Sequence, residues 1–136
     1  MPLIVDFLLP KVPVSHQTKS KDRKEAWRDF VYGRALHAWP ATPLIDCDLK
    51  FTMVYLADNP TAGDINNFVK PVQDALCSLI YADDSMVLDV SAHMRFFDLP
   101  TSVAGIPGLL AQAILSGEPC VYVAISDSRD LGKELT

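Results

Sequence analysis

The chain has 136 residues, about half of them apolar, and a formal net charge of −5. This length and composition predict one domain with a modest hydrophobic core, and the apolar runs fall far short of the roughly 18 residues that a membrane span needs. The acidic balance argues mildly against a general nucleic-acid coat, because nonspecific affinity comes largely from lysine and arginine neutralising phosphates.

The first part of the chain predicts two strands with a loop and a helix between them. Residues 3–9 are rich in β-forming side chains and end at Pro10, and the presence of Asp6 favours a strand over a signal peptide. The loop that follows has no helical period. Over residues 22–39, apolar side chains recur at spacings of three to five, which indicates an amphipathic helix. Residues 44–57 alternate between apolar and polar positions, as a half-buried strand does.

The next segment predicts a second helix and a third strand. Apolar side chains recur every three or four positions over residues 65–80. Pro71 is tolerated best near the beginning of a helix, so we expect the helix to start near Asn66 or Asn67, with either asparagine as its N-cap. After a turn, residues 86–97 have the composition of a strand.

The last segment predicts a short helix, which would be a lid or a packing element, and a final strand. This strand covers residues 120–126, and residues 127–136 form a charged, flexible tail. The element order β-α-β-α-β-(short α)-β predicts an α/β (α+β) fold. We expect a single-domain mixed sheet over residues 1–126 with two main helices packed on it.

Three cysteines, Cys47, Cys77 and Cys120, are widely spaced in apolar surroundings and lack C-x-x-C pairs. They predict buried free thiols in a protein of the reducing cytoplasm. A zinc site would need one or more of the three histidines brought to these cysteines by tertiary contacts that no local spacing supports.

Carboxylates gather around one lysine between residues 64 and 90. The sequence there reads D-I-N-N-F-V-K-P-V-Q-D-A-L and, after an apolar stretch, Y-A-D-D-S-M-V-L-D-V. Magnesium takes oxygen ligands, usually one or two carboxylates plus waters and substrate phosphates, and a nearby lysine supplies a point charge for an anion. The cluster therefore predicts a metal site for phosphodiester hydrolysis. We expect Asp64 and Asn66 on an extended approach to the helix, where side chains two apart point the same way.

Each of these residues also has a purely structural interpretation. Asp64 could cap the helix that follows it, and Asp83 and Asp84 could be turn residues. Lys70 and Asp74 lie four apart on a helix and could form a solvated ion pair. The functional interpretation rests on all of these residues occurring together at one spacing.

The motif D-I-N-N-x-x-K-P-x-x-D-A-L, followed by D-D-x-x-V, resembles the RusA-type Holliday junction resolvases, a family of small phage-related and bacterial endonucleases. The resemblance implies that Asp64 and Asp84 are metal ligands that act in catalysis, with Asp83 as a further ligand. It also implies that Lys70 is the catalytic lysine. The family has a second metal-binding aspartate where this chain has Asn66. An asparagine offers a carbonyl oxygen but no charge, so metal binding should be weaker.

The resemblance also implies a cofactor and partners. The cofactor would be Mg²⁺, with Mn²⁺ as a substitute, and the substrate would be branched DNA such as a four-way junction. Resolving a junction takes two symmetrically related nicks, so the resemblance implies a homodimer, of phage or prophage origin. Residues 99–119 would be an insertion relative to the family.

A basic segment precedes the acidic cluster. Its lysines and arginines are opposed by few carboxylates, whereas acids dominate from residue 46 onward. The related enzymes need a cationic surface near the acidic site, so we expect this segment to contact DNA and to be more than a solvated helix face. The predicted DNA-binding residues are Lys19, Lys21, Arg23, Lys24 and Arg28.

These observations lead to one main prediction and two alternatives. The main prediction is a magnesium-dependent, structure-specific endodeoxyribonuclease that resolves Holliday junctions or other branched DNA in recombination and repair. The first alternative is a RusA-like DNA-binding protein whose catalysis is impaired by Asn66. The second, a hydrolase of small phosphates, is disfavoured because the sequence has no glycine-rich phosphate cradle.

Overall fold

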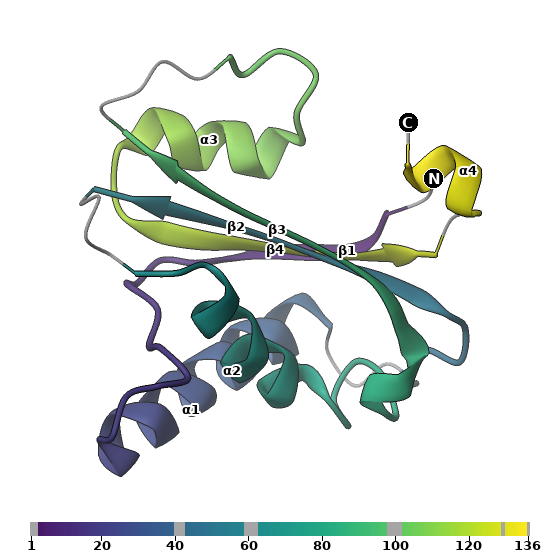
Figure 1. The fold of residues 1–136 in the computed structure, drawn as a ribbon, viewed down its shortest axis with the longest axis horizontal. Coiled ribbons are helices and arrows are strands. Elements are labelled where there is room, and N and C mark those ends of the chain that lie inside the picture. The colour runs from purple at the N-terminus through teal and green to yellow at the C-terminus, as the bar shows by residue number, and fades with distance from the viewer. Residues whose placement is uncertain (1–2, 40–42, 59–62, 98–101, 129, 136) are drawn as a thin grey trace.

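A four-stranded mixed sheet runs through the centre of the molecule (Figure 1). The computed structural model describes residues 3–39, 43–58, 63–97, 102–128 and 130–135. Strand β4 lies antiparallel between β1 and β2, and β2 is parallel to β3. The sheet has the order β1-β4-β2-β3, with the bounds β1 (Leu3–Leu9), β2 (Leu49–Ala57), β3 (Val87–Phe96) and β4 (Cys120–Asp127).

Helices cover both faces of this sheet (Figure 1). Helices α1 (Lys21–Ala38) and α2 (Asn66–Leu76) lie on one face, and α3 (Gly108–Ser116) lies on the other. The 3₁₀ helix η1 (Asp84–Met86) leads into β3, and α4 (Leu131–Glu134) follows β4. The predicted α+β class and element order are confirmed. None of the helices built from the described residues has the length and apolarity that crossing a bilayer requires.

The hydrophobic core is divided by the sheet into two parts. The larger part lies between the sheet and helices α1 and α2, and the smaller part lies beneath α3. Apolar burial of this kind stabilises a fold by about 25 cal/mol per Å². The larger part includes Val31, Phe51, Met53, Val72, Leu76 and Val123, and the smaller part includes Val54, Leu56, Leu110, Ala113 and Tyr122.

Strand β2 is shorter and more buried than its sequence predicts. Residues 44–48 continue the alternating pattern, but the strand begins at Leu49, the first residue with a partner on both β3 and β4. Among the described residues before it, Ile45 makes only an isolated bridge to Tyr81. Val54 and Leu56 lie beneath α3 and are only 8% and 3% exposed, so the prediction of a half-buried strand is wrong for this part of β2.

The other predicted elements agree closely with the structure. Strand β1 has the predicted bounds, and the predicted first helix is α1. Helix α3 lies between Pro107 and Gly117, whose φ of 72° gives a left-handed C-cap, and its apolar side chains pack on the sheet. Helix α2 ends at Leu76, before the end of the predicted apolar stripe, and the buried Ile80 follows in a turn.

The three cysteines are free thiols that differ in exposure. Cys120 is buried and Cys77 is partly exposed, whereas Cys47 is exposed. The prediction of buried thiols is therefore wrong for Cys47. This residue precedes β2, where the sheet does not cover it, and its Sγ lies 3.5 Å from a carboxylate oxygen of Asp127.

The segment predicted as a flexible tail contains the short helix α4. Its N-cap is Asp130, whose side chain accepts the backbone N–H of Lys133 at 2.9 Å. Glu134 forms an ion pair with Lys50 of β2, and both side chains are only 16% exposed. The ion pair with Lys50 connects α4 to the sheet.

Candidate active site

The beginning of α2 is organised by Asp64. Its Oδ1 accepts the backbone N–H of Asn66 at 3.1 Å, a contact that stabilises the first turn of the helix. Ile65 occupies the N-cap position with φ −55° and ψ −34°, so neither predicted asparagine cap is present. The predicted extended approach is also wrong, because Ile65 has helical dihedral angles. Residues two apart on a helix do not face each other, so backbone alternation does not bring the Asp64 and Asn66 side chains together.

Pro71 leaves one backbone carbonyl of α2 free to accept a hydrogen bond from the loop that follows β1. It is the sixth residue of the helix, and its missing N–H leaves the carbonyl of Asn67, four residues earlier, without a helical donor. That carbonyl accepts the backbone N–H of His16 at 2.6 Å. The helix can therefore contain Pro71 beyond its first turn, and the loop is attached at the candidate site.

Lys70 is held between two carboxylates from different elements. Its Nζ lies 2.9 Å from Asp74 Oδ1 on α2 and 3.2 Å from Asp84 Oδ2 in η1. All three side chains are 48% exposed, so solvent can reach them. The hydrogen bonds to Asp74 and to Asp84 raise the pKa of Lys70, which keeps it a cation at neutral pH. The structure thus joins the two halves of the acidic motif through one lysine.

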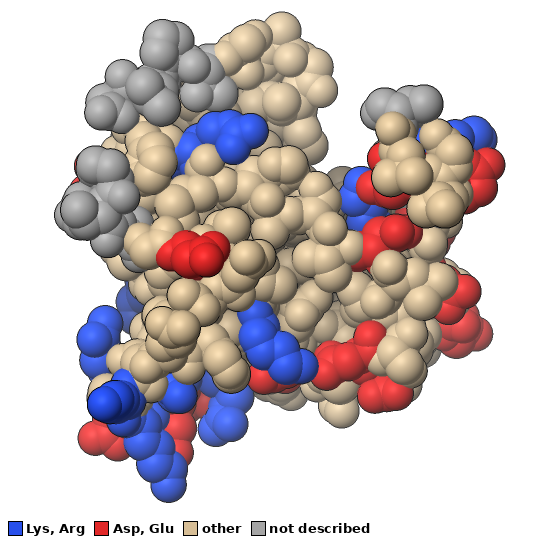
Figure 2. Space-filling view, viewed as in Figure 1, with Lys and Arg blue, Asp and Glu red and all other residues tan. Residues whose placement is uncertain are grey.

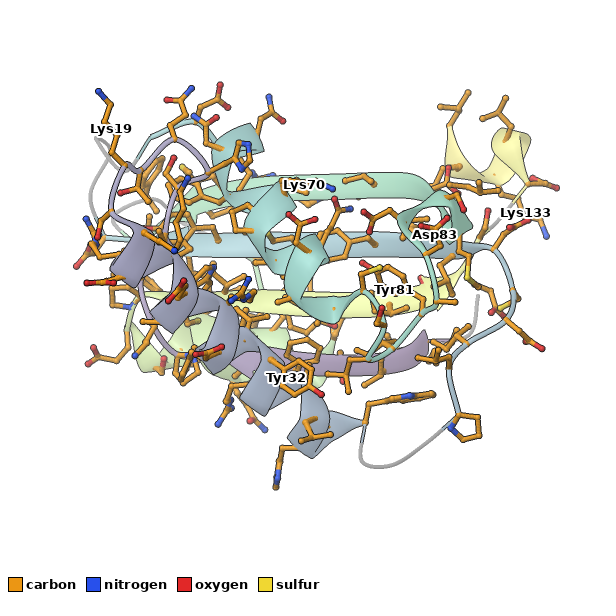
Figure 3. The ribbon with its side chains drawn as sticks, turned by 90° about the horizontal axis from the view of Figure 1, so that it is seen from below. Lys19, Tyr32, Lys70, Tyr81, Asp83 and Lys133 are labelled. Carbon is orange, nitrogen blue, oxygen red and sulfur yellow. The ribbon has the colours of Figure 1, made fainter. Side chains whose placement is uncertain are left out.

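The turn before β3 contains the neighbouring aspartates Asp83 and Asp84. Asp83 occupies the N-cap of η1, and its Oδ2 accepts the hydroxyl of Ser85 at 2.6 Å. This hydrogen bond, helped by backbone N–H groups, lowers the pKa of Asp83. Figure 3 shows Lys70 on α2 and Asp83 in the turn, on the face of the sheet that carries both long helices. Asp83 thus has the predicted turn role, whereas Asp84 contacts Lys70.

The predicted metal ligands have the oxygen donors that a hard cation prefers. Asp64 and Asp84 would supply carboxylates to the predicted metal and Asn66 an amide oxygen, and Mg²⁺ usually takes only one or two protein carboxylates together with waters and substrate phosphates. Among the described residues, no three His, Cys, Asp or Glu side chains are grouped so that they could hold a metal ion. Of the predicted site residues, the structure brings Lys70 and Asp84 into direct contact, and the metal ligands stay a prediction.

Residues 7–125 match the family described as endodeoxyribonuclease RusA. The chain belongs to this family. The matched region includes β2, β3, helices α1 to α3, the whole acidic motif, the end of β1 and most of β4. No curated protein matches the chain. Membership of the RusA family implies an endodeoxyribonuclease, and the predicted family assignment is confirmed.

The basic residues of this RusA-type protein are divided between two surfaces. Figure 2 shows lysine and arginine gathered over the beginning of α1, and aspartate and glutamate gathered toward the opposite end of the molecule. Lys21, Lys24 and Arg28 line a cavity of about 350 Å³ that also includes Asp74 of α2. Arg23 lines a separate cavity together with Tyr55, Asp58 and Phe68, and Lys19 lies in the loop before α1.

Sequence reasoning missed the hydrogen bond that the backbone N–H of His16 donates to the carbonyl of Asn67. The signal for it was Pro71, because a proline inside a helix shows that a particular carbonyl needs a donor from elsewhere. The sequence does not say which segment provides that donor. The contact with Asn67 becomes visible only when the loop after β1 is placed beside α2.

Proposed function

We propose that this RusA-family protein is a magnesium-dependent endonuclease that cuts four-way DNA junctions. The observation that carries the proposal is the contact between Lys70 and Asp84, which joins the two acidic halves of the family motif. A solvent-accessible lysine can bind a phosphate oxygen, and carboxylates beside it can bind a metal ion that contacts the same phosphate. The substrate is DNA, as the family implies, and the junction specificity belongs to the proposal.

The protein ligands of the metal would be Asp64, Asn66 and Asp84, with Asp83 as a further ligand. A bound Mg²⁺, or Mn²⁺ in its place, would supply a water for in-line attack and would neutralise charge on the phosphate. Lys70 would contact a non-bridging phosphate oxygen as charge develops there. Asp74 gives Lys70 a second partner, so the lysine remains positioned when Asp84 is engaged elsewhere.

Asn66 supports a second candidate function, a RusA-type DNA-binding protein with impaired cleavage. A neutral amide lowers the charge of the site, and the affinity of such sites for hard cations depends on ligand charge. It also cannot accept a proton from a water, so any general-base role passes to Asp64 or Asp84. The two candidates therefore differ in cleavage and not in fold or DNA binding.

A homodimer is part of the proposal, because two nicks of opposite strands require two sites related by a two-fold axis. The edge strand β3 supports it. Leu88 and Val90 of β3 are 59% and 54% exposed, and being two apart on a strand they point to the same side, where a second copy could cover them. They follow closely after Asp84, so a partner placed on this edge would lie beside the site.

The test is a cleavage assay on a synthetic four-way junction, with a linear duplex of the same sequence as the control substrate. Paired nicks in the junction with Mg²⁺ or Mn²⁺ support the proposed endonuclease. Asp84→Asn should abolish them, whereas Glu118→Gln, which alters an exposed carboxylate in the turn between α3 and β4, should not.

The same assay separates the two candidates. Junction binding without nicks, with nicking restored by Asn66→Asp, supports the DNA-binding protein with impaired cleavage. Nicking that survives Asp84→Asn contradicts the site assignment. If the protein neither binds nor cuts any DNA, both candidates are wrong.

A further inference from the structure

The cavity between α1, α2 and the loop after β1 has a basic lining that the acidic site does not use. It measures about 350 Å³ and includes Lys21, Lys24 and Arg28, which lie three and four positions apart on α1. His16 lines it from the loop, and Pro71 and Asp74 line it from α2. The cavity therefore collects cationic side chains in a protein whose net charge is −5.

The carboxylates of this cavity already have cationic partners. Glu25 pairs with Lys21 at 4.0 Å, and Asp74 pairs with Lys70 at 2.9 Å. Within the described parts of the chain, Lys24 and Arg28 have no ion-pair partner. Two positive charges at the cavity are thus not neutralised by the protein.

A residue of the cavity lining also carries a buried, unpaired donor. Trp27 lines the cavity and is only 3% exposed, and its buried indole N–H has no hydrogen-bond acceptor among the described residues. The beginning of α1 adds the partial positive charge of a helix N-terminus. The two unpaired charges at the cavity are therefore cations, which is complementary to an oxyanion.

We infer that this cavity binds a backbone phosphate of the DNA strand that is cut, with Lys24 and Arg28 as the ligands of that phosphate. The inference rests on the proposed function and adds a second phosphate contact to it. Asp74 both lines the cavity and holds Lys70, which lies one helical turn away. A strand whose scissile phosphate meets Lys70 would therefore carry a neighbouring phosphate toward the cavity. Inorganic phosphate shares this chemistry and serves as a probe.

The experiment compares the wild-type protein with the double variant Lys24→Gln/Arg28→Gln. The dissociation constant for a four-way junction is measured without divalent metal over a range of salt concentrations. If one phosphate contact is lost, the slope of log K against log salt should become shallower by about 0.9. Arg95→Gln is the matched control, because Arg95 is an exposed arginine on β3 that lines a different cavity, and it should leave the slope unchanged.

A second measurement follows the indole resonance of Trp27 by NMR while inorganic phosphate is added. We expect the resonance to shift in the wild type and to stop shifting in the double variant. An unchanged salt slope in a wild type that binds and cuts junctions overturns the cavity inference and leaves the proposed function intact. A phosphate-induced shift with an unchanged salt slope assigns the cavity to free phosphate and overturns the DNA contact. Failure of the wild type to bind or cut DNA overturns the proposed function itself.

Discussion

Replacing Lys70 by methionine separates its structural role from its proposed role in cleavage. Its ion pairs with Asp74 and Asp84 join side chains that are 48% exposed, and pairs exposed to this degree contribute about 0–1 kcal/mol each. We therefore expect Lys70→Met to lower the free energy of unfolding by less than about 1 kcal/mol. Loss of a positioned donor to a developing oxyanion lowers rates by about 10²–10³-fold, so we expect cleavage to fall by that factor.

The assay for Lys70→Met combines urea unfolding with single-turnover cleavage of a four-way junction at saturating protein. Lys11→Met is the control: it removes a surface cation whose Nζ lies 4.6 Å from the centre of the Phe30 ring, a contact of about 0.5–1 kcal/mol. It should lower stability to a similar extent without slowing cleavage. Cleavage within threefold of wild type, or a loss of unfolding free energy above about 2 kcal/mol, would refute the reasoning.

The pH dependence of this lysine follows from its partners. Asp74 and Asp84 raise the pKa of Lys70, so the folded state binds this proton more tightly than the unfolded state does. Its contribution to stability is complete below the unfolded value of about 10.4 and is lost as the pH rises through the higher folded value. The difference in cleavage between wild type and Lys70→Met should therefore persist from neutral pH to about pH 9.

Three further predictions test the core, the exposed thiol and the metal site. Leu76→Ala should lower the free energy of unfolding, measured by urea titration, by about 2–5 kcal/mol, because Leu76 is fully buried. The control Leu115→Ala, at a side chain that is 76% exposed, should change it by about 0.5 kcal/mol or less. A thiol reagent should label the exposed Cys47 before the buried Cys120. Desolvation and neighbouring carboxylates raise the pKa of Cys47 above the usual thiol value of about 8.5, so its labelling rate should still be rising above that pH. A labelling rate that reaches a plateau below about pH 8.5 would contradict this. Asn66→Asp should lower the Mg²⁺ concentration for half-maximal cleavage by about tenfold, and an unchanged concentration would argue against this residue as a metal ligand.

Local sequence patterns were sufficient to predict most elements of the fold. The alternating or apolar runs of β1 and β4 and the helical period of α1 depend on residues close together in the chain, and the structure shows them within one or two residues of the expected bounds. Strand β2 shows where this reasoning fails. Its start at Leu49 depends on where β3 and β4 supply partners, and the burial of Val54 depends on α3, which lies far along the chain.

The sequence by itself determined the family and the chemical groups of the candidate site: two sets of aspartates, one lysine, and Asn66 in place of an aspartate. Only the tertiary structure decided which of these groups meet. The pairing of Lys70 with Asp84 requires α2 to lie against the turn before β3, and the contact of His16 with Asn67 requires the loop after β1 to reach α2. Both contacts depend on how separate segments pack around the sheet, and the spacing of residues within one segment carries no information about that packing.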